Sequence, residues 1–296
     1  MARCGTETNE AVIASGIVTY NPDMGRLREN LNSILPQVDR VFIFDNASKN
    51  INELRLLIED EYKSCPVSLC VNSRNAGMAV ALNALAKRAI ADGYEQILFL
   101  DQDSVAGDNL LVEEMQIAGD DIGIVCPQIY DRNEKEQRDN PPSVCEVERA
   151  ITAGSLLNLN VFSVVGGYDE RLFIDWVDFD YCASLALHGY RILKTGKASI
   201  LHEVGRKEYA GKTIVLNSDG KPIVRSHYRT NHSPMRRRDK ARSMAIMARK
   251  YSGTAIGKKV RFWIMKSVIR DIVYEKRKLE FVSALISGYR EGAGVR

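Results

Sequence analysis

The chain has 296 residues, of which 45% are hydrophobic and 27% charged, as in an ordinary globular protein with a full core. This length fits one large domain, or one domain with an appendage. Residues 1–10 are polar, and polar residues interrupt the apolar stretch at 151–168, so we expect no signal peptide and no transmembrane helix. The six cysteines form no CxxC pair and are expected to be reduced thiols in a cytoplasmic protein.

The net charge of +3 is distributed unevenly along the chain. Residues 221–296 contain 20 Lys and Arg against 5 Asp and Glu, whereas the rest of the chain contains 21 against 33. A basic end favours contact with an anionic partner such as a membrane surface or a phosphorylated substrate, although a solvated helical face has the same composition. The acidic remainder and the lack of a nucleic-acid-reading motif argue against nucleic acid as the partner.

The first hundred residues alternate between two hydrophobic periods. Short runs rich in Val, Ile, Phe and Leu predict buried parallel strands at residues 12–20, 40–45, 67–71 and 96–100. Between them, apolar residues recur at helical spacing in residues 27–35, 51–58 and 78–89. This alternation predicts an α/β fold with βαβ units and a doubly wound, mostly parallel sheet.

The rest of the chain predicts further elements and a boundary. We expect a strand at 122–126, a helix from Asp178 to just before Gly189, and a loop at 205–222. Basic amphipathic helices are expected at 240–251 and 260–286. The predicted organisation is therefore an α/β domain over residues 1–235, followed by a basic helical extension over residues 236–296.

Polar residues follow each of the four predicted parallel strands. They are Thr19 and Tyr20, Asp45 and Asn46, residues 72–77, and residues 101–104. Ligands of doubly wound sheets bind beyond the carboxyl ends of the strands, so this edge is the expected site.

The sequence Asp101-Gln102-Asp103 is the strongest candidate for a metal site. Where a chain turns at a strand end, both carboxylates can reach one ion, and carboxylate oxygens suit Mg²⁺ or Mn²⁺. Such an ion would neutralise charge on a departing diphosphate. The alternative is a turn in which the aspartates only accept local hydrogen bonds.

At this point six motifs, in order, show that the chain resembles the family 2 glycosyltransferases of the GT-A fold, and among them the bacterial rhamnosyltransferases of polysaccharide assembly. The motifs are IVTYNP at 17–22, VFIFDNAS at 41–48, NAGMAVALN at 75–83, FLDQDS at 99–104, FIDWVDFDY at 173–181 and ILHEVG at 200–205. The resemblance covers roughly residues 11–250. It implies a Rossmann-like half that binds the nucleotide sugar and a second half that binds the acceptor.

The resemblance also implies an activity. It is the inverting transfer of a sugar, with L-rhamnose from dTDP-rhamnose as the expected donor and Mg²⁺ or Mn²⁺ as the cofactor. The implied acceptor is a glycan or a polyprenyl-diphosphate-linked glycan, in cell-surface polysaccharide synthesis at the inner membrane face. Residues 255–286 combine many basic residues with an apolar stripe formed by Val260, Trp263, Ile264, Val268 and Ile272. This composition predicts peripheral attachment to an anionic membrane, while a partner subunit remains the alternative.

The resemblance assigns roles to the strand-end residues. Asp45 is expected to accept a hydrogen bond from the pyrimidine imide N–H, in a pocket lined by Thr19 and Tyr20. Asn75 and Gly77 precede a helix, where free N–H groups face diphosphate or ribose. Asp101 and Gln102 are expected to contact the nucleotide sugar. His202 is the implied third metal ligand beside Asp101 and Asp103.

The same resemblance places the catalytic base in an acidic segment. In the family the base is the second residue of a Glu-Asp pair, which here is Val177-Asp178, so Asp178 is the expected base. Because the Glu is missing, Asp175 and Asp180 remain alternatives. Weaker acceptor or diphosphate contacts are expected from Trp176 by stacking and from Arg236 and Arg237 by bidentate hydrogen bonds.

Two other functions remain open. An apolar strand followed by DxDxV also fits haloacid-dehalogenase-like phosphatases, in which Asp101 would be the nucleophile and Asp103 a general acid. The departures at Val177 and after Arg237 would also fit an inactive, transferase-like binding protein.

Overall fold

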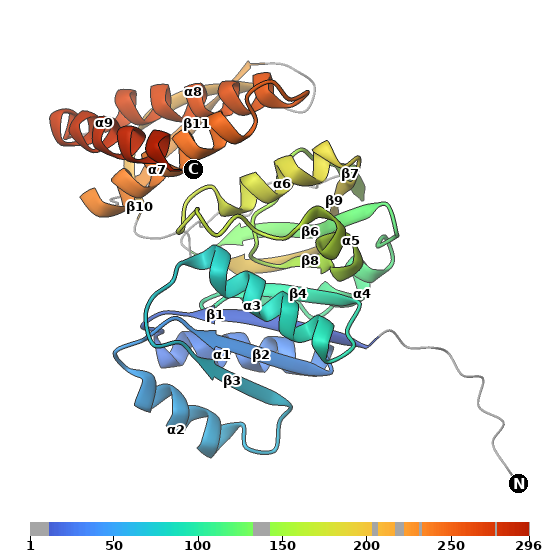
Figure 1. Cartoon of the computed structure of the whole chain (residues 1–296). Helices are drawn as coiled ribbons and strands as arrows, with labels where there is room; N and C mark the ends of the chain where they lie inside the picture. The colour runs from blue at the N-terminus through green and yellow to red at the C-terminus, as the bar shows by residue number, and fades with distance from the viewer. Residues whose placement is uncertain are drawn as a thin grey trace, which may run out of the picture.

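The computed structural model describes residues 12–132, 143–202, 207–216, 222–230, 233–275 and 277–295. Within these ranges a central sheet is covered by helices on both faces, and three C-terminal helices lie together at one end of the molecule (Figure 1).

The first half of the sheet is parallel, as predicted. Its strands lie in the order β3 (Val67–Val71), β2 (Arg40–Asp45), β1 (Ile13–Thr19) and β4 (Gln96–Asp101). The connecting helices are α1 (Met24–Ile34), α2 (Ile51–Glu61) and α3 (Met78–Ala91), with a short 3₁₀ turn η1 at Leu35–Gln37. Each lies where apolar residues recur at helical spacing, because such a stripe is buried only when it packs on the sheet.

The second half of the sheet is mixed. After β4 come β8 (Ser155–Asn158), β6 (Ile122–Asp131), β9 (Arg191–His202) and β5 (Val105–Ala106), while β7 (Val144–Glu146) also pairs with β9. Only β6 and β9 run parallel here. The helices of this half are α4 (Leu110–Met115), α5 (Leu159–Val165) and α6 (Val177–Leu187). The predicted strand at 122–126 and the helix after residue 177 are thus present.

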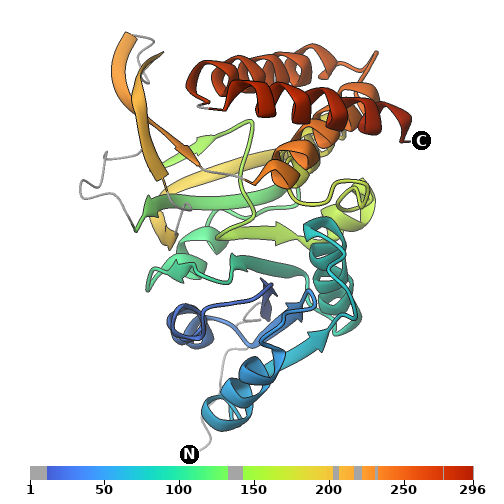
Figure 2. The same ribbon diagram turned by 90° about the vertical axis from the view of Figure 1, so that its left-hand side faces the viewer.

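Two apolar layers hold the helices against the sheet. Alternate residues of β4 point to opposite faces, so that Ile97 and Phe99 pack with α3, α5 and α6, whereas Leu98 and Leu100 pack with α1, α2 and α4. Figure 2 shows these two helical layers on either side of the strands. Burial on both faces explains why the predicted strands are continuous apolar runs.

The C-terminal part differs from the prediction in two places. Residues 207–216, expected as a loop, form β10 (Lys207–Leu216), which pairs with β11 (Pro222–Thr230) in a separate hairpin. The expected single helix at 260–286 is two helices, α8 (Gly257–Tyr274) and α9 (Lys278–Gly294), which follow α7 (Pro234–Lys250). The hairpin had a local signal, since the turn pair Asp219-Gly220 lies in the sequence between the apolar runs at 214–216 and 223–224. The break between the helices had none, because no Gly or Pro marks it.

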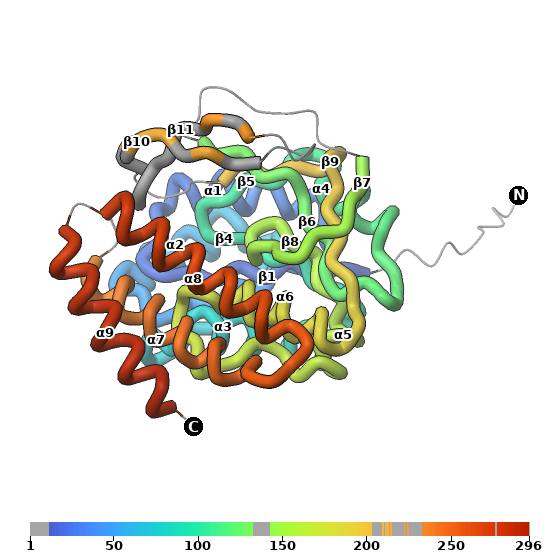
Figure 3. The backbone as a smooth tube through the Cα atoms, turned by 90° about the horizontal axis from the view of Figure 1, so that it is seen from above, coloured from blue at the N-terminus to red at the C-terminus, as the bar shows by residue number. Residues whose placement is uncertain are grey.

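Tertiary packing explains the break between α8 and α9. A Cβ atom at Gly288 would lie 2.1 Å from the carbonyl oxygen of Arg238, and one at Gly292 would lie 2.2 Å from that of Arg242. These glycines therefore let α9 approach the backbone of α7, which requires the chain to turn back after α8. Figure 3 shows the three helices lying across one another above α6.

A third apolar cluster joins these helices to the main domain. Trp176 and Ala183 of the α6 segment pack there with Met244 and Met247 of α7 and with Trp263 of α8. Among the residues described, no helix has the length and hydrophobicity needed to cross a bilayer.

Candidate active site

The strand ends bring the predicted polar residues to one edge of the sheet. In the register of the parallel strands Thr19 is the partner of Asp45, and Val18 is the partner of Asp101. The residues that follow β1, β2 and β4 therefore lie side by side, which the carboxyl-end rule predicts.

Asp45 is fully buried and hydrogen-bonded on both carboxylate oxygens. Its Oδ1 accepts from Thr19 Oγ1 at 3.0 Å and from Ser48 Oγ at 2.5 Å, and its Oδ2 accepts from the backbone N–H of Ser48 at 2.9 Å. The predicted neighbour Thr19 is thus in contact with Asp45. Both side chains are held by hydrogen bonds within the protein, at the place where the pyrimidine ring of the nucleotide is expected to bind.

Gln102 and Tyr20 connect the end of β1 with the turn at residues 101–104, here called the acidic turn. The side-chain oxygen of Gln102 accepts from the backbone N–H of Tyr20 at 2.8 Å, and its Nε2 donates to the Tyr20 carbonyl at 3.5 Å. Tyr20 is 46% exposed, so it is available to a ligand at this edge.

Asn75 and Gly77 shape the loop before α3. The side chain of Asn75 accepts from the N–H of Gly77 at 3.0 Å, so it is used within its own turn. Gly77 has φ of 90°, and a Cβ there would lie 2.5 Å from the carbonyl oxygen of Phe173. Glycine is therefore required for the contact between this loop and the segment that precedes α6.

Asp101, Asp103 and His202 converge at the end of β4. One ligand atom from each lies within 4.8 Å of the others. His202 Nε2 is 3.7 Å from Asp101 Oδ2, and His202 Nδ1 is 3.4 Å from Asp103 Oδ1. His202 comes from the end of β9, across the sheet from β4, which is why only the motif resemblance could pair it with the aspartates.

The donor set fits a divalent cation. The buried oxygen Asp103 Oδ1 faces His202 Nδ1 at 3.4 Å and makes no well-formed hydrogen bond among the described residues, so it is available to an ion. Burial lowers the pKa of His202, but the adjacent carboxylates of Asp103, Asp101 and Asp131 outweigh burial and raise it. Burial also raises the pKa of Asp101. Two carboxylates and an imidazole are ligands that Mn²⁺ and Mg²⁺ accept, and the clustered negative charge favours a cation.

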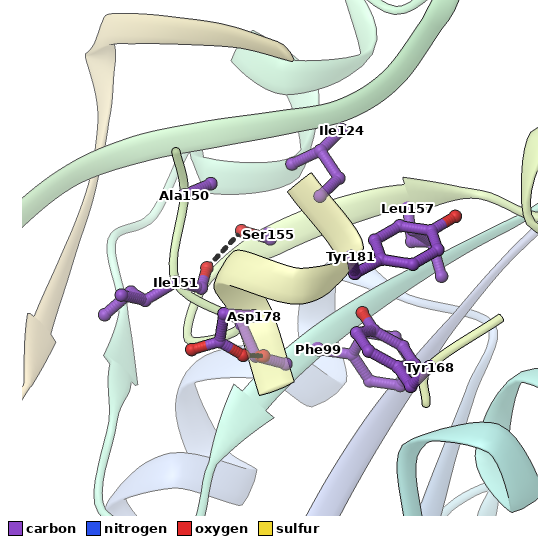
Figure 4. A pocket seen from close by; sticks show the side chains of 10 residues that line it. Phe99, Ile124, Ala150, Ile151, Ser155, Leu157, Tyr168, Asp178 and Tyr181 are labelled. Carbon is purple, nitrogen blue, oxygen red and sulfur yellow. Dashed lines mark hydrogen bonds between the residues drawn. The ribbon is translucent and has the colours of Figure 1, made fainter. Parts of the chain in front are cut away.

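Asp178 lies in the first turn of α6, beside a narrow cavity of about 10 Å³, room for about one water molecule. Its Oδ1 accepts a hydrogen bond from Thr152 Oγ1. Burial raises the pKa of Asp178 to about 6, against the hydrogen bond from Thr152 and with the help of the charge of Asp101. Figure 4 shows Asp178 at one side of the cavity and Tyr168 and Tyr181 at the other.

The other two acids of this segment are engaged elsewhere. Asp180 is fully buried and binds Lys250 Nζ at 2.7 Å and Tyr251 Oη at 3.0 Å. Burial raises the pKa of Asp180, and Lys250 opposes this shift. Asp175 pairs with Arg236, whose Nε lies 3.4 Å from Asp175 Oδ2. Among the described residues, Asp178 is therefore the acid of the three that has no ion pair, and the charge of Asp101 contributes to its raised pKa.

Of the three residues predicted to contact the acceptor or the diphosphate more weakly, Arg236 lies near the metal site, whereas Arg237 and Trp176 do not contact it. The charge of Arg236 lowers the pKa of Asp101, which places this guanidinium near the metal site. Arg237 instead pairs with Glu275 at 3.0 Å. Trp176 is 8% exposed and packs edge to face on Phe179, with the ring centroids 5.5 Å apart. Both Arg237 and Trp176 thus contribute to the packing of the C-terminal helices.

Several residues of the site have no role in the predictions from sequence. They are Asn30, Ser48, Ser104, Asp131 and Thr152. Ser48 and Ser104 belong to the motifs at 41–48 and 99–104 but had no role of their own. Asn30, Asp131 and Thr152 reach the site from α1, from β6 and from the segment before β8, and no spacing along the chain indicates this.

Solved structures with low sequence identity share this fold. The S. aureus TarS fragment 1-349 aligns over 95% of this chain and 81% of its own length, with 14% identity and a TM-score of 0.58. The mannosyltransferase PcManGT from Pyrobaculum calidifontis, solved with GDP-Man and Mn²⁺, aligns over 96% and 76%, with 14% identity and a TM-score of 0.57. GalNAc-T7, solved with UDP, GalNAc and Mn²⁺, aligns over 91% of this chain, which spans only 59% of it, with 15% identity and a TM-score of 0.57. The fold is therefore that of the GT-A glycosyltransferases.

Sequence comparison defines the family. The profile described as "Glycosyl transferase family 2" matches residues 16–189, more than half of the chain. The dTDP-rhamnosyl transferase RfbF of Shigella flexneri is 25% identical over 255 residues, which cover 79% of each protein. The chain belongs to glycosyl transferase family 2, and the resemblance noted from its motifs is confirmed.

Proposed function

We propose that this protein transfers L-rhamnose from dTDP-rhamnose, with inversion at the anomeric carbon, to a glycan or a lipid-linked glycan at the cytoplasmic face of the inner membrane. The convergence of Asp101, Asp103 and His202 at the strand ends, near the partly buried carboxylate of Asp178, carries this proposal. The similarity to RfbF supports the choice of donor.

Asp178 is the proposed base. The acceptor hydroxyl attacks the anomeric carbon as the bond from that carbon to the diphosphate oxygen breaks, and the hydroxyl proton passes to Asp178. With a pKa near 6 this carboxylate is ionised at neutral pH, and it is a stronger base than an exposed aspartate. Thr152 fixes its orientation through the hydrogen bond to Oδ1.

The donor is proposed to lie along the edge of the sheet. Tyr20 and the end of β2 at Asp45 receive the nucleotide, and the loop at 75–77 lies beside them, since Asn46 hydrogen-bonds to the backbone of Ala76 and Gly77. A divalent ion bound by Asp101, Asp103 and His202 would neutralise charge on the departing diphosphate. Arg236 is close enough to lower the pKa of Asp101 and is proposed to exchange Asp175 for a phosphate oxygen.

A donor screen tests this function. The protein is incubated with Mn²⁺ or Mg²⁺ and with dTDP-rhamnose, UDP-N-acetylglucosamine or GDP-mannose, and the release of nucleoside diphosphate is followed with a glycan extract as acceptor. We expect dTDP release to be the fastest and to require the metal. Hydrolysis of p-nitrophenyl phosphate without a donor would instead support the phosphatase alternative, and donor binding without any release would support an inactive transferase.

Most of the stripe predicted on α8 is not available to a membrane, because Val260 and Trp263 are buried and Ile264 and Val268 pack against the same cluster. The proposed membrane-binding surface is therefore the outer face of α8. Phe262, Met265, Ile269 and Val273 of α8 are each more than half exposed and, at spacings of three and four residues, share one helical face. Exposed basic residues accompany this stripe at Lys258, Lys259, Arg261, Lys266 and Arg270. An apolar stripe flanked by long cationic side chains complements an anionic bilayer surface.

Vesicle flotation tests this surface. We expect the protein to float with vesicles that contain phosphatidylglycerol and to stay behind with neutral vesicles. Phe262→Ser combined with Met265→Ser should abolish flotation, whereas the control Val112→Ser, an exposed apolar position on α4, should not. Equal recovery with both lipid compositions, or concentration-dependent dimers that the double variant disrupts, would count against a membrane partner.

A further inference from the structure

Asn30 of α1 is fully buried and lies directly behind the acidic turn. Its Nδ2 donates to the carbonyl oxygen of Asp101 at 2.9 Å and to that of Ser104 at 2.7 Å. The backbone N–H of Ser104 also donates to the Asp101 carbonyl at 3.0 Å. One side-chain amide therefore joins both ends of the turn that presents Asp101 and Asp103.

Two further residues on the same side of α1 and of the turn that follows it contact the chain after this turn. The Oγ of Ser33 accepts from the N–H of Ala106 at 2.9 Å. Gln37 donates from Nε2 to the Gly107 carbonyl at 3.0 Å. Since positions 30, 33 and 37 are three and four residues apart, they share one face. This polar face runs along residues 101–107 and fixes them to the helix.

A buried asparagine on this helix needs a reason. The other buried residues of α1 are Leu27, Leu31 and Ile34, so an apolar residue would satisfy the core at position 30. A buried amide is costly unless it is hydrogen-bonded. The hydrogen bonds of Asn30 go to the backbone of the acidic turn, which holds the carboxylates of Asp101 and Asp103 close together against their mutual repulsion.

The turn also positions the third ligand. Ser104 Oγ lies 3.1 Å from His202 Nδ1, and the Ser104 carbonyl is one of the two acceptors of Asn30. Groups that hold metal ligands in place without touching the ion commonly change metal affinity about 10- to 100-fold when they are removed.

We propose that Asn30 is a positioning residue for the metal site, which sets the separation of Asp101 and Asp103 by clamping the backbone of their turn. This inference rests on the proposed function only in requiring that these residues bind a divalent cation. It assigns to α1 a part in metal binding that none of its side chains performs by direct contact.

Mn²⁺ binding to the purified full-length protein tests the proposal. Free Mn²⁺ is followed by its electron paramagnetic resonance signal, and the Mn²⁺-induced rise in melting temperature is measured separately for each variant. Asn30→Leu leaves both carbonyls without their donor and should weaken Mn²⁺ binding about 10- to 100-fold. Asn30→Asp serves as the second variant if Asn30→Leu does not fold. It keeps the side-chain volume but loses the Nδ2 donor, so it should weaken Mn²⁺ binding to a similar extent.

Asn83→Leu is the matched control. Asn83 is also buried, donates to the Tyr168 carbonyl at 2.9 Å and accepts from the Tyr168 N–H at 2.9 Å, and these bonds do not involve the acidic turn. It should lower the melting temperature as much as Asn30→Leu but leave Mn²⁺ affinity unchanged.

The outcomes separate the two claims. Asn30 variants that are folded and bind Mn²⁺ like the wild type overturn the positioning role and leave the proposed function intact. A wild-type protein that binds no Mn²⁺ overturns both this role and the proposed metal site. A loss of Mn²⁺ affinity in Asn83→Leu equal to that in Asn30→Leu would show a general effect of stability and would also overturn the proposal.

Discussion

Asp101 and Asp103 are separated by one residue, as are Asp178 and Asp180, yet the structure treats the two pairs in opposite ways. The carboxylates at the end of β4 converge with His202 within 4.8 Å. Those on α6 diverge, because residues two apart on a helix do not face each other. Asp178 contacts Thr152, whereas Asp180 is buried against Lys250 and Tyr251.

This difference teaches that the spacing of acids has meaning only together with the backbone that carries them. At a strand end the spacing produces a chelating pair. On a helix it directs the two acids to different sides: Asp178 is the proposed catalytic base, whereas Asp180 connects α6 with α7 through its ion pair with Lys250. The experiments below should therefore separate loss of chemistry from loss of stability.

Asp178→Asn should give the largest effect on activity. The amide keeps the shape and the contact with Thr152 but cannot take up the acceptor proton, so kcat should fall about 10²- to 10⁴-fold. Donor binding should persist. The measurement is nucleoside diphosphate release, with Asp175→Asn as the control for loss of a nearby charge. A kcat near that of the wild type would remove Asp178 as the base.

Asp103→Ala should give the next largest effect, a loss of activity of about 100-fold or more, if the ion stabilises several kcal/mol of developing charge. Mn²⁺ binding should be lost in parallel, as measured by the resonance signal of free Mn²⁺. Asp108→Ala changes an exposed acid a few residues further along and should leave both unchanged. Full activity of Asp103→Ala in a chelator would contradict metal dependence.

Lys250→Met should lower the free energy of unfolding without affecting the chemistry, and it therefore tests the structural role of Asp180. Lys250 Nζ lies 2.7 Å from Asp180 and 3.1 Å from Asp169, and its removal leaves both buried carboxylates without this partner. Asp180 is fully buried, but the Lys250 side chain is 28% exposed, so the loss should be smaller than for a fully buried pair, on the order of 2 kcal/mol. Urea unfolding should show this loss, while folded protein keeps its kcat.

The exposed pair between Lys259 and Glu148 provides the matched control for this variant. Lys259→Met should change the free energy of unfolding by less than about 1 kcal/mol. Because Arg171 and Lys250 outweigh burial and lower the pKa of Asp169, its stabilising contribution should be present at neutral pH and be lost as the pH falls into the acid range. A Lys250→Met variant as stable as the control would show that the pair does not hold α7 in place.

The pH profile should show the smallest change. Since burial raises the pKa of Asp178 to about 6, the base is protonated below that pH, and kcat should fall about 10-fold for each pH unit below it. Activity at saturating donor and metal should therefore rise through pH 6 and then level off. A profile that is flat down to pH 5 would place the base on a group with an ordinary aspartate pKa.

The sequence by itself determined the first half of the fold and the kind of chemistry. Apolar runs and helical stripes predicted β1 to β4 and α1 to α3 with errors of a few residues, because burial on both sheet faces leaves a strong local signal. The polar residues after those strands predicted the edge that holds the site, since parallel strands end at the same edge.

Only the tertiary structure decided how the acids divide their roles and how the C-terminal part folds. Local sequence gave no reason for Asn30 to clamp the acidic turn, for Lys250 to engage Asp180, or for Gly288 to bring α9 onto α7. These contacts join residues far apart in the chain. The physical reason is that the effect of a buried polar group or of a glycine depends on the group it contacts. That contact is determined by tertiary packing and not by the neighbouring residues in sequence.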